Sequence, residues 1–140
     1  TLMDTEIILV KEFRSPVRNE SGFVCELPSG SSKDTESATI EVALKEVEEE
    51  VGLRIDSSRI RVGHRKQVVS TFSTHKCSLF YAEVTEEEIA QVKANPEPRG
   101  EEGSSERTYP CVLTLSEASG ILDWSMLGMV LQTLVEEVKF

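Results

Sequence analysis

The sequence contains no long hydrophobic run. Of its 140 residues, 39% are hydrophobic and 29% are charged, and no apolar stretch approaches the roughly 18 residues that a membrane-spanning helix needs. This composition is typical of a globular protein, and we expect no association with a membrane. A chain of this length is expected to form a single domain, residues 1–140, around one hydrophobic core.

Cysteine is scarce. Cys25, Cys77 and Cys111 are too few and too scattered for a disulfide framework, and no two of them have the CxxC spacing of a zinc site. We expect reduced, mostly buried thiols. With no signal peptide in sight, an intracellular and most simply cytoplasmic location is expected. The chain starts at Thr1, so an organellar location stays open if a targeting segment has been removed.

Basic residues are outnumbered, with 15 Lys and Arg against 25 Asp and Glu and a net charge of −10. A domain of this charge repels a polyphosphate backbone, so direct binding of nucleic acid is not expected. A small phosphorylated substrate is compatible with it if divalent cations lie between carboxylates and phosphate. Acidity alone does not establish this, because most surface glutamates are simply solvated.

The spacing of apolar residues predicts strands and helices in alternation. Strands are expected at residues 6–13, 23–27, 59–69, 77–84 and 109–115. Helices are expected at residues 40–51, where Gly52 ends the run, at residues 86–94, after a capping box at Thr85, and at residues 123–138. This order predicts an α/β domain with a mixed β-sheet and helices on both of its faces.

The helix predicted at residues 40–51 carries an acidic cluster. Glu46, Glu49 and Glu50 are spaced i, i+3 and i+4, which places them on one helix face. Three like charges repel one another there unless a cation neutralises them, and Mg²⁺, which prefers oxygen ligands, is the suitable ion. A solvated acidic face is the more frequent explanation for a glutamate run taken by itself.

The surroundings of this run favour the metal site. The run follows Glu26-Leu27-Pro28-Ser29-Gly30 and closes on Val51-Gly52-Leu53. Together the segments resemble the Nudix box, which reads Gly, five residues, Glu, seven residues, Arg-Glu, aliphatic, any, Glu-Glu, any, Gly, aliphatic. Gly30 and Glu36 fit its first half, and residues 45–53 fit its second half with Lys45 in place of arginine. Eight residues instead of seven separate Glu36 from Lys45, so the match carries one insertion.

The segment Val10-Lys11-Glu12-Phe13-Arg14, followed by the Glu26–Gly30 segment, is similar to the ADP-sugar and nucleotide-sugar diphosphatase branch of the Nudix hydrolases. The resemblance implies a Nudix-type α/β/α sandwich that uses Mg²⁺ or Mn²⁺ to cleave the diphosphate of a nucleoside diphosphate linked to another group. ADP-ribose enzymes often carry a proline where residues 67–70 have none, so another nucleotide sugar is favoured. The chain would begin on the second core strand, so the first strand is expected to be removed, absent, or supplied by a homodimer or another protein partner that completes the sheet.

The resemblance also implies roles for individual residues. The expected metal-binding residues are Glu26, Gly30, Glu46, Glu49 and Glu50. The expected substrate contacts are Arg14, Lys45 and His75. The general base is expected at Glu49 or in the acidic loop of residues 96–106, at Glu102 or Glu106, and this loop is expected to close over the bound diphosphate.

A second kind of function stays open. A Nudix domain that has diverged at Ser31, Ser37 and Lys45 could serve as a binding or scaffold subunit of a larger assembly, including an RNA-processing one. Retention of all three helix glutamates favours the hydrolase.

Overall fold

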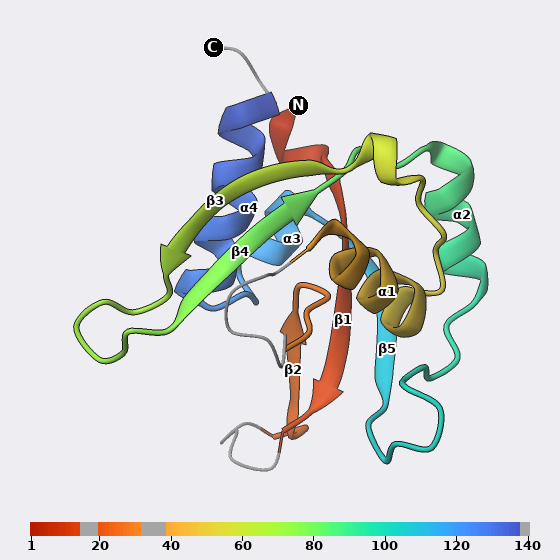
Figure 1. Ribbon diagram of the computed structural model, residues 1–140. Helices are drawn as coiled ribbons and strands as arrows, with labels where there is room; N and C mark the ends of the chain where they lie inside the picture. The colour runs from red at the N-terminus through yellow and green to blue at the C-terminus, as the bar shows by residue number, and fades with distance from the viewer. Residues whose placement is uncertain (15–19, 32–38, 138–140) are drawn as a thin grey trace.

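The computed structural model describes residues 1–14, 20–31 and 39–137 (Figure 1). The strands are β1 (Glu6–Phe13), β2 (Phe23–Glu26), β3 (Arg61–Gln67), β4 (Lys76–Tyr81) and β5 (Thr108–Thr114). The α-helices are α1 (Ile40–Val51), α2 (Glu86–Ala94), α3 (Leu115–Ser119) and α4 (Trp124–Glu137), and two 3-10 turns are η1 (Leu2–Asp4) and η2 (Ser57–Arg59). The five predicted strands and three predicted helices are confirmed, with ends that differ by a few residues. The short helix α3 was not predicted.

Two separate antiparallel sheets form. The larger has the order β2-β1-β5, with β1 in the middle, and the smaller is the hairpin of β3 and β4. The prediction of a mixed sheet is wrong for the described strands, because every pairing among them is antiparallel. Parallel neighbours in one sheet need a crossover connection, whereas α1 leads from β2 to a strand of the other sheet.

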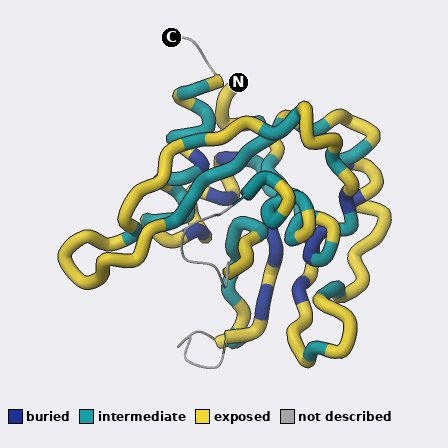
Figure 2. The backbone as a smooth tube through the Cα atoms, viewed as in Figure 1, coloured by how far each residue is buried: buried dark blue, intermediate teal, exposed yellow. Residues whose placement is uncertain are grey.

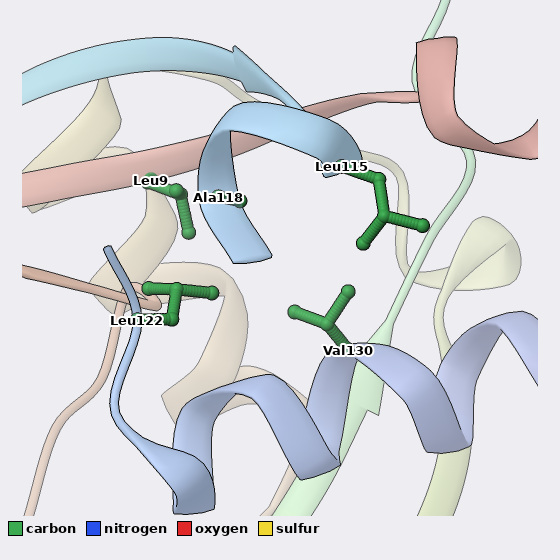
Figure 3. Close-up of a cluster of buried hydrophobic side chains, with 5 residues drawn as sticks. All are labelled: Leu9, Leu115, Ala118, Leu122 and Val130. Atoms are coloured by element: carbon green, nitrogen blue, oxygen red, sulfur yellow. The ribbon is translucent and has the colours of Figure 1, made fainter. Parts of the chain in front are cut away.

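Helices pack on both faces of the three-stranded sheet, as predicted. Successive side chains of a strand point to opposite faces, and β1 buries both Leu9 and Val10. Leu9 meets residues of α3, α4 and the turn between them in the cluster drawn in Figure 3: Leu115, Ala118, Leu122 and Val130. Val10 packs on the other face with residues from α1, the segment after it and α2: Val51, Leu53 and Val92.

Helix α1 begins and ends where its sequence dictates. Thr39 caps the N-terminus, where its hydroxyl accepts a hydrogen bond from the Val42 amide at 3.4 Å. Gly52 adopts the left-handed conformation at φ 81°, and its amide donates to the carbonyls of Val47 and Glu48. Val47 and Val51 face the sheet, which fixes the rotation of the helix and hence the positions of its glutamates.

Strand β3 and the loop after it are mostly exposed, whereas most of β4 is half-buried (Figure 2). The two strands form a hairpin. It is attached to α4 by polar contacts, since the Tyr81 hydroxyl donates to Glu136 at 2.8 Å and Arg61 pairs with Glu137. Two large apolar residues of α4, Trp124 and Leu131, are exposed. The core contacts of α4 come from other positions: Met126, Leu127, Val130 and Leu134.

Within the described ranges, none of the helices is long and apolar enough to pass through a membrane. The three cysteines are free, as predicted, but they are half-buried rather than fully buried.

Candidate functional site

The sheet brings two glutamates under α1. Residues opposite each other in an antiparallel pair point to the same face, and β1 pairs Val10 with Glu26 and Glu12 with Val24. Because Val10 packs against α1, the side chains of Glu12 and Glu26 lie on the α1 side of the sheet as well. Glu12 is nearly inaccessible to solvent, which is uncommon for a carboxylate without a compensating partner.

Glu50 is the most deeply buried glutamate of α1, with 8% of its surface exposed. Its carboxylate accepts a hydrogen bond from the Ser29 amide at 2.9 Å. Burial raises the pKa of Glu50 to about 7; the bond from Ser29 acts against this rise, and the charges of Glu46, Glu106 and Glu12 add to it. Glu50 is therefore a carboxylate held in a site that disfavours its charged form.

Glu46 lies against Gly30. A Cβ atom at position 30 would overlap the Glu46 carboxylate, so the absence of a side chain at Gly30 lets that carboxylate lie against the backbone. Burial raises the pKa of Glu46, and the charge of Glu49 raises it further. Glu49 itself is 3.4 Å from Lys45 on the same helix, an i, i+4 pair of the kind common on helix surfaces. Predicted residues Gly30, Glu46 and Glu50 are thus brought together, while Lys45 pairs along its own helix.

Arg14 connects the two sheet glutamates. Its guanidinium is 2.9 Å from Glu12 and 3.4 Å from Glu26. Burial raises the pKa of Glu12, and a side-chain hydrogen bond with Glu106 raises it further, while the charge of Arg14 lowers it. The side chains of Glu12 and Glu106 therefore lie close together.

Glu106 is the loop glutamate that reaches these carboxylates. The loop is fixed at its base, where the backbones of Arg99 and Thr108 exchange hydrogen bonds of 2.8 and 2.7 Å. A Cβ at Gly100 would overlap the Glu106 carbonyl, so the two ends of the loop approach closely. Charge on Glu106 raises the pKa of both Glu46 and Glu50. Glu102, the other predicted base, lies in an exposed turn.

We call the five glutamates that lie on this side of the sheet the carboxylate cluster: Glu12, Glu26, Glu46, Glu50 and Glu106. His75, predicted to contact substrate, is not brought to it. His75 lies in the exposed loop between β3 and β4, where its Nε2 is 3.7 Å from the Cys77 sulfur. Two further residues of the motif argument, Glu36 and Ser37, lie outside the described residues.

The donor chemistry of the cluster suits a hard divalent cation. Its side chains offer only oxygen, and Gly30 leaves the backbone open beside Glu46. Among residues 1–14, 20–31 and 39–137, no three acidic, histidine or cysteine side chains converge closely enough to hold an ion as they stand. Repulsion between carboxylates favours such a spread arrangement.

Sequence reasoning missed Glu12. The signal was present, because Ile8, Val10 and Glu12 alternate along β1 and therefore share one face. That face is apolar up to Glu12. The opposite face of β1 is apolar too, at Ile7 and Leu9, so alternation did not distinguish an inward glutamate from an outward one.

No family model matches the sequence, and no curated protein matches it. The functional argument accordingly rests on the motif and on the geometry of the carboxylate cluster.

Proposed function

We propose that the protein is a hydrolase that uses Mg²⁺ or Mn²⁺ to cleave the diphosphate of a nucleoside diphosphate linked to another group, a nucleotide sugar in particular. The observation that carries this proposal is the burial of Glu50 near three other glutamates, Glu46, Glu106 and Glu12, beside the backbone of Ser29 and Gly30. A buried carboxylate surrounded by like charges is costly unless a cation compensates it.

The orientation of the helix glutamates supports a metal site rather than a solvated acidic surface. Glu41 and Glu48 of α1 are exposed to solvent, as the glutamates of a solubilising face would be. Glu46 and Glu49 are half-buried and Glu50 is buried. The acidic run therefore divides into an outer set that meets water and an inner set that meets the Ser29–Gly30 backbone and the sheet.

Gly30 supplies a second, independent support. Its φ is ordinary, so backbone conformation does not require glycine at this position. Glycine instead leaves space for the Glu46 carboxylate, which a side chain at position 30 would displace. Close approach of a carboxylate to an open backbone is what a site needs when a peptide carbonyl and a glutamate are to bind the same cation.

The residues of the carboxylate cluster and Arg14 each have a role in the proposed hydrolysis. A bound divalent cation would neutralise the diphosphate and lower the pKa of the water that attacks it. Glu46 and Glu50 offer ligand oxygens from α1, and Glu26 offers one from the end of β2. Glu106 is placed to accept the proton of the water, because it is the loop carboxylate that reaches the cluster. Arg14, whose side chain is about half exposed, is available to donate hydrogen bonds to phosphate oxygens.

A panel of nucleotide sugars, assayed with Mg²⁺ and with EDTA, tests the proposal. We expect magnesium-dependent release of a sugar phosphate and a nucleoside monophosphate, and loss of this turnover in Glu50→Gln. Glu41→Gln, the same substitution at an exposed position of the same helix, should retain full activity and serves as the matched control.

Absence of turnover across the panel with either Mg²⁺ or Mn²⁺ would contradict the hydrolase. If divalent cations still bound under those conditions, the alternative of a binding or scaffold subunit would be favoured. Equal loss of activity in both variants would also contradict the assignment, because it would show that the effect of Glu50→Gln does not come from its place in the cluster.

A further inference from the structure

Strand β1 ends, and β2 and β5 begin, at the same end of the larger sheet (Figure 1). Three aromatic residues at these strand ends are in ring contact: Phe13, Phe23 and Tyr109. The Phe13 and Phe23 ring centroids are 5.8 Å apart with planes at 74°, and those of Phe23 and Tyr109 are 5.8 Å apart at 78°. These residues are nevertheless 58%, 36% and 37% exposed, in that order. Such a group of exposed rings marks a binding surface more often than scattered exposed residues do.

A cavity of about 400 Å³ opens on these rings. Its lining also includes Glu12, Glu106 and Arg107. We call this cavity the aromatic pocket. Its volume lies within the range of small-molecule sites, and two of its lining residues, Glu12 and Glu106, also belong to the carboxylate cluster. The aromatic pocket therefore opens beside the site proposed for the diphosphate.

We propose that the aromatic pocket holds the nucleobase of the substrate. This inference rests on the proposed function. Among the described residues, Phe13 and Tyr109 each contact one other ring, edge to face, and Gly22 lies against the Phe13 ring. Because Phe13 is 58% exposed and Tyr109 37%, part of each ring stays available for stacking. A planar base stacks on such a face, and stacking tolerates any base because every base has a π-face.

The charges around the aromatic pocket support a base over other ligands. A phosphate in the pocket would be repelled by Glu12 and Glu106, so the phosphates belong on the metal side of these residues. Arg107 introduces a positive charge into the same lining, so the aromatic pocket is not uniformly acidic. The guanidinium of Arg107 is fixed in place, because it donates to the carbonyls of Ser104 and Glu106 at 2.7 Å each. A neutral ring with hydrogen-bonding edges is not repelled by these glutamates, and both Arg107 and the Tyr109 hydroxyl can donate to it.

Neutral nucleosides test the aromatic pocket without metal or catalysis. Adenosine, cytidine and uridine, with free ribose as the baseless control, are titrated into the ¹⁵N-labelled protein in EDTA. We expect the nucleosides to shift the amide signals of Phe13, Phe23 and residues 107–109 and ribose to leave them unchanged. Shifts centred elsewhere, or equal shifts with ribose, would overturn the proposal.

Two variants with a matched control sharpen the test. Phe13→Leu keeps apolar bulk and removes a ring, and we expect it to weaken nucleoside binding about fivefold or more. Phe72→Leu makes the same change at a phenylalanine that is 90% exposed in the loop between β3 and β4, and binding should be unchanged. Tyr109→Leu provides a second removal of a ring if Phe13→Leu is poorly folded. Undiminished binding in a folded ring-deleted variant would overturn the proposal.

Failure of this inference is distinguishable from failure of the proposed function. Turnover of nucleotide sugars with no base-dependent binding at the aromatic pocket would overturn the pocket and leave the hydrolase intact. Base-dependent binding that Phe13→Leu weakens, without any turnover, would support the pocket and contradict the hydrolase.

Discussion

Replacing Glu50 by glutamine should make the metal-free protein more stable, and the gain should grow with pH. Burial raises the pKa of Glu50 from the ordinary glutamate value of 4.5 to about 7. In the unfolded chain its pKa returns to the ordinary value, so between pH 4.5 and 7 the folded protein binds more protons. The wild-type free energy of unfolding therefore falls as the pH rises through this window.

The size of the effect follows from the two pKa values. The difference between about 7 and 4.5 is about 2.5 pH units, which corresponds to about 3 kcal/mol at 1.36 kcal/mol per unit. Glutamine carries no charge, and its carbonyl can still accept the hydrogen bond from the Ser29 amide. We expect Glu50→Gln to be more stable than wild type by up to about 3 kcal/mol at pH 8 and to differ little from it at pH 4.5.

Urea unfolding in EDTA, followed by circular dichroism at half-unit steps from pH 4.5 to 8.5, measures this difference. Glu48→Gln is the control, because Glu48 lies on the same helix and its charge is exposed beside Arg54. That variant should show a small and nearly constant difference from wild type. A pH-independent difference for Glu50→Gln, or a loss of stability at pH 8, would refute the reasoning, since it would mean that Glu50 is not a carboxylate whose charge the fold disfavours.

The remaining predictions concern single contacts. Gly30→Ala should leave the fold intact but weaken binding of Mn²⁺ about tenfold by isothermal titration calorimetry, because the new Cβ displaces the Glu46 carboxylate; unchanged affinity would remove Gly30 from the site. Gly52→Ala should lower the free energy of unfolding by about 1–2 kcal/mol, since φ is 81° and a Cβ would overlap the Arg99 guanidinium. Gly120→Ala is the control, because Gly120 has φ −89° and the nearest atom to a new Cβ would be 3.7 Å away. This variant should change the free energy of unfolding by less than about 0.5 kcal/mol. Equal losses of stability in Gly52→Ala and Gly120→Ala would contradict a conformational role for Gly52. The hydrogen bond from Arg59 lowers the pKa of Glu88 to about 2, so its stabilisation is present above pH 4.5 and is lost as the pH falls through 2. Glu88→Gln should then cost about 1 kcal/mol at pH 7 and progressively less below pH 5, and a loss that grows towards low pH would exclude the ion pair as its cause.

Features with a local physical cause were predictable from the sequence. Gly52 ends α1 because a left-handed residue suits the helix C-terminus, and Thr85 begins α2 with the capping box that its sequence indicates. The spacing of Glu46 and Glu50 likewise follows from helix geometry, so their shared face could be predicted before any tertiary contact was known.

Features that depend on strand pairing could not be predicted in the same way. The antiparallel pairing of β1 with β5 joins residues about a hundred positions apart, and no local pattern specifies it. Glu12 meets Glu106, and Phe23 meets Tyr109, only through that register. His75 was wrongly included in the site. It was predicted to contact the substrate from a polar loop, but that loop belongs to the separate hairpin of β3 and β4.

Locating a bound divalent cation tests most directly whether the carboxylate cluster is a metal site for diphosphate hydrolysis. Substoichiometric Mn²⁺ added to the ¹⁵N-labelled protein broadens the amide signals nearest the ion. The account predicts that signals of Ser29, Gly30 and residues 46–50 are lost first, and that Glu50→Gln abolishes this selectivity. Broadening centred on the exposed glutamates at the start of α2, Glu86 and Glu87, or spread evenly over the acidic surface, would contradict it.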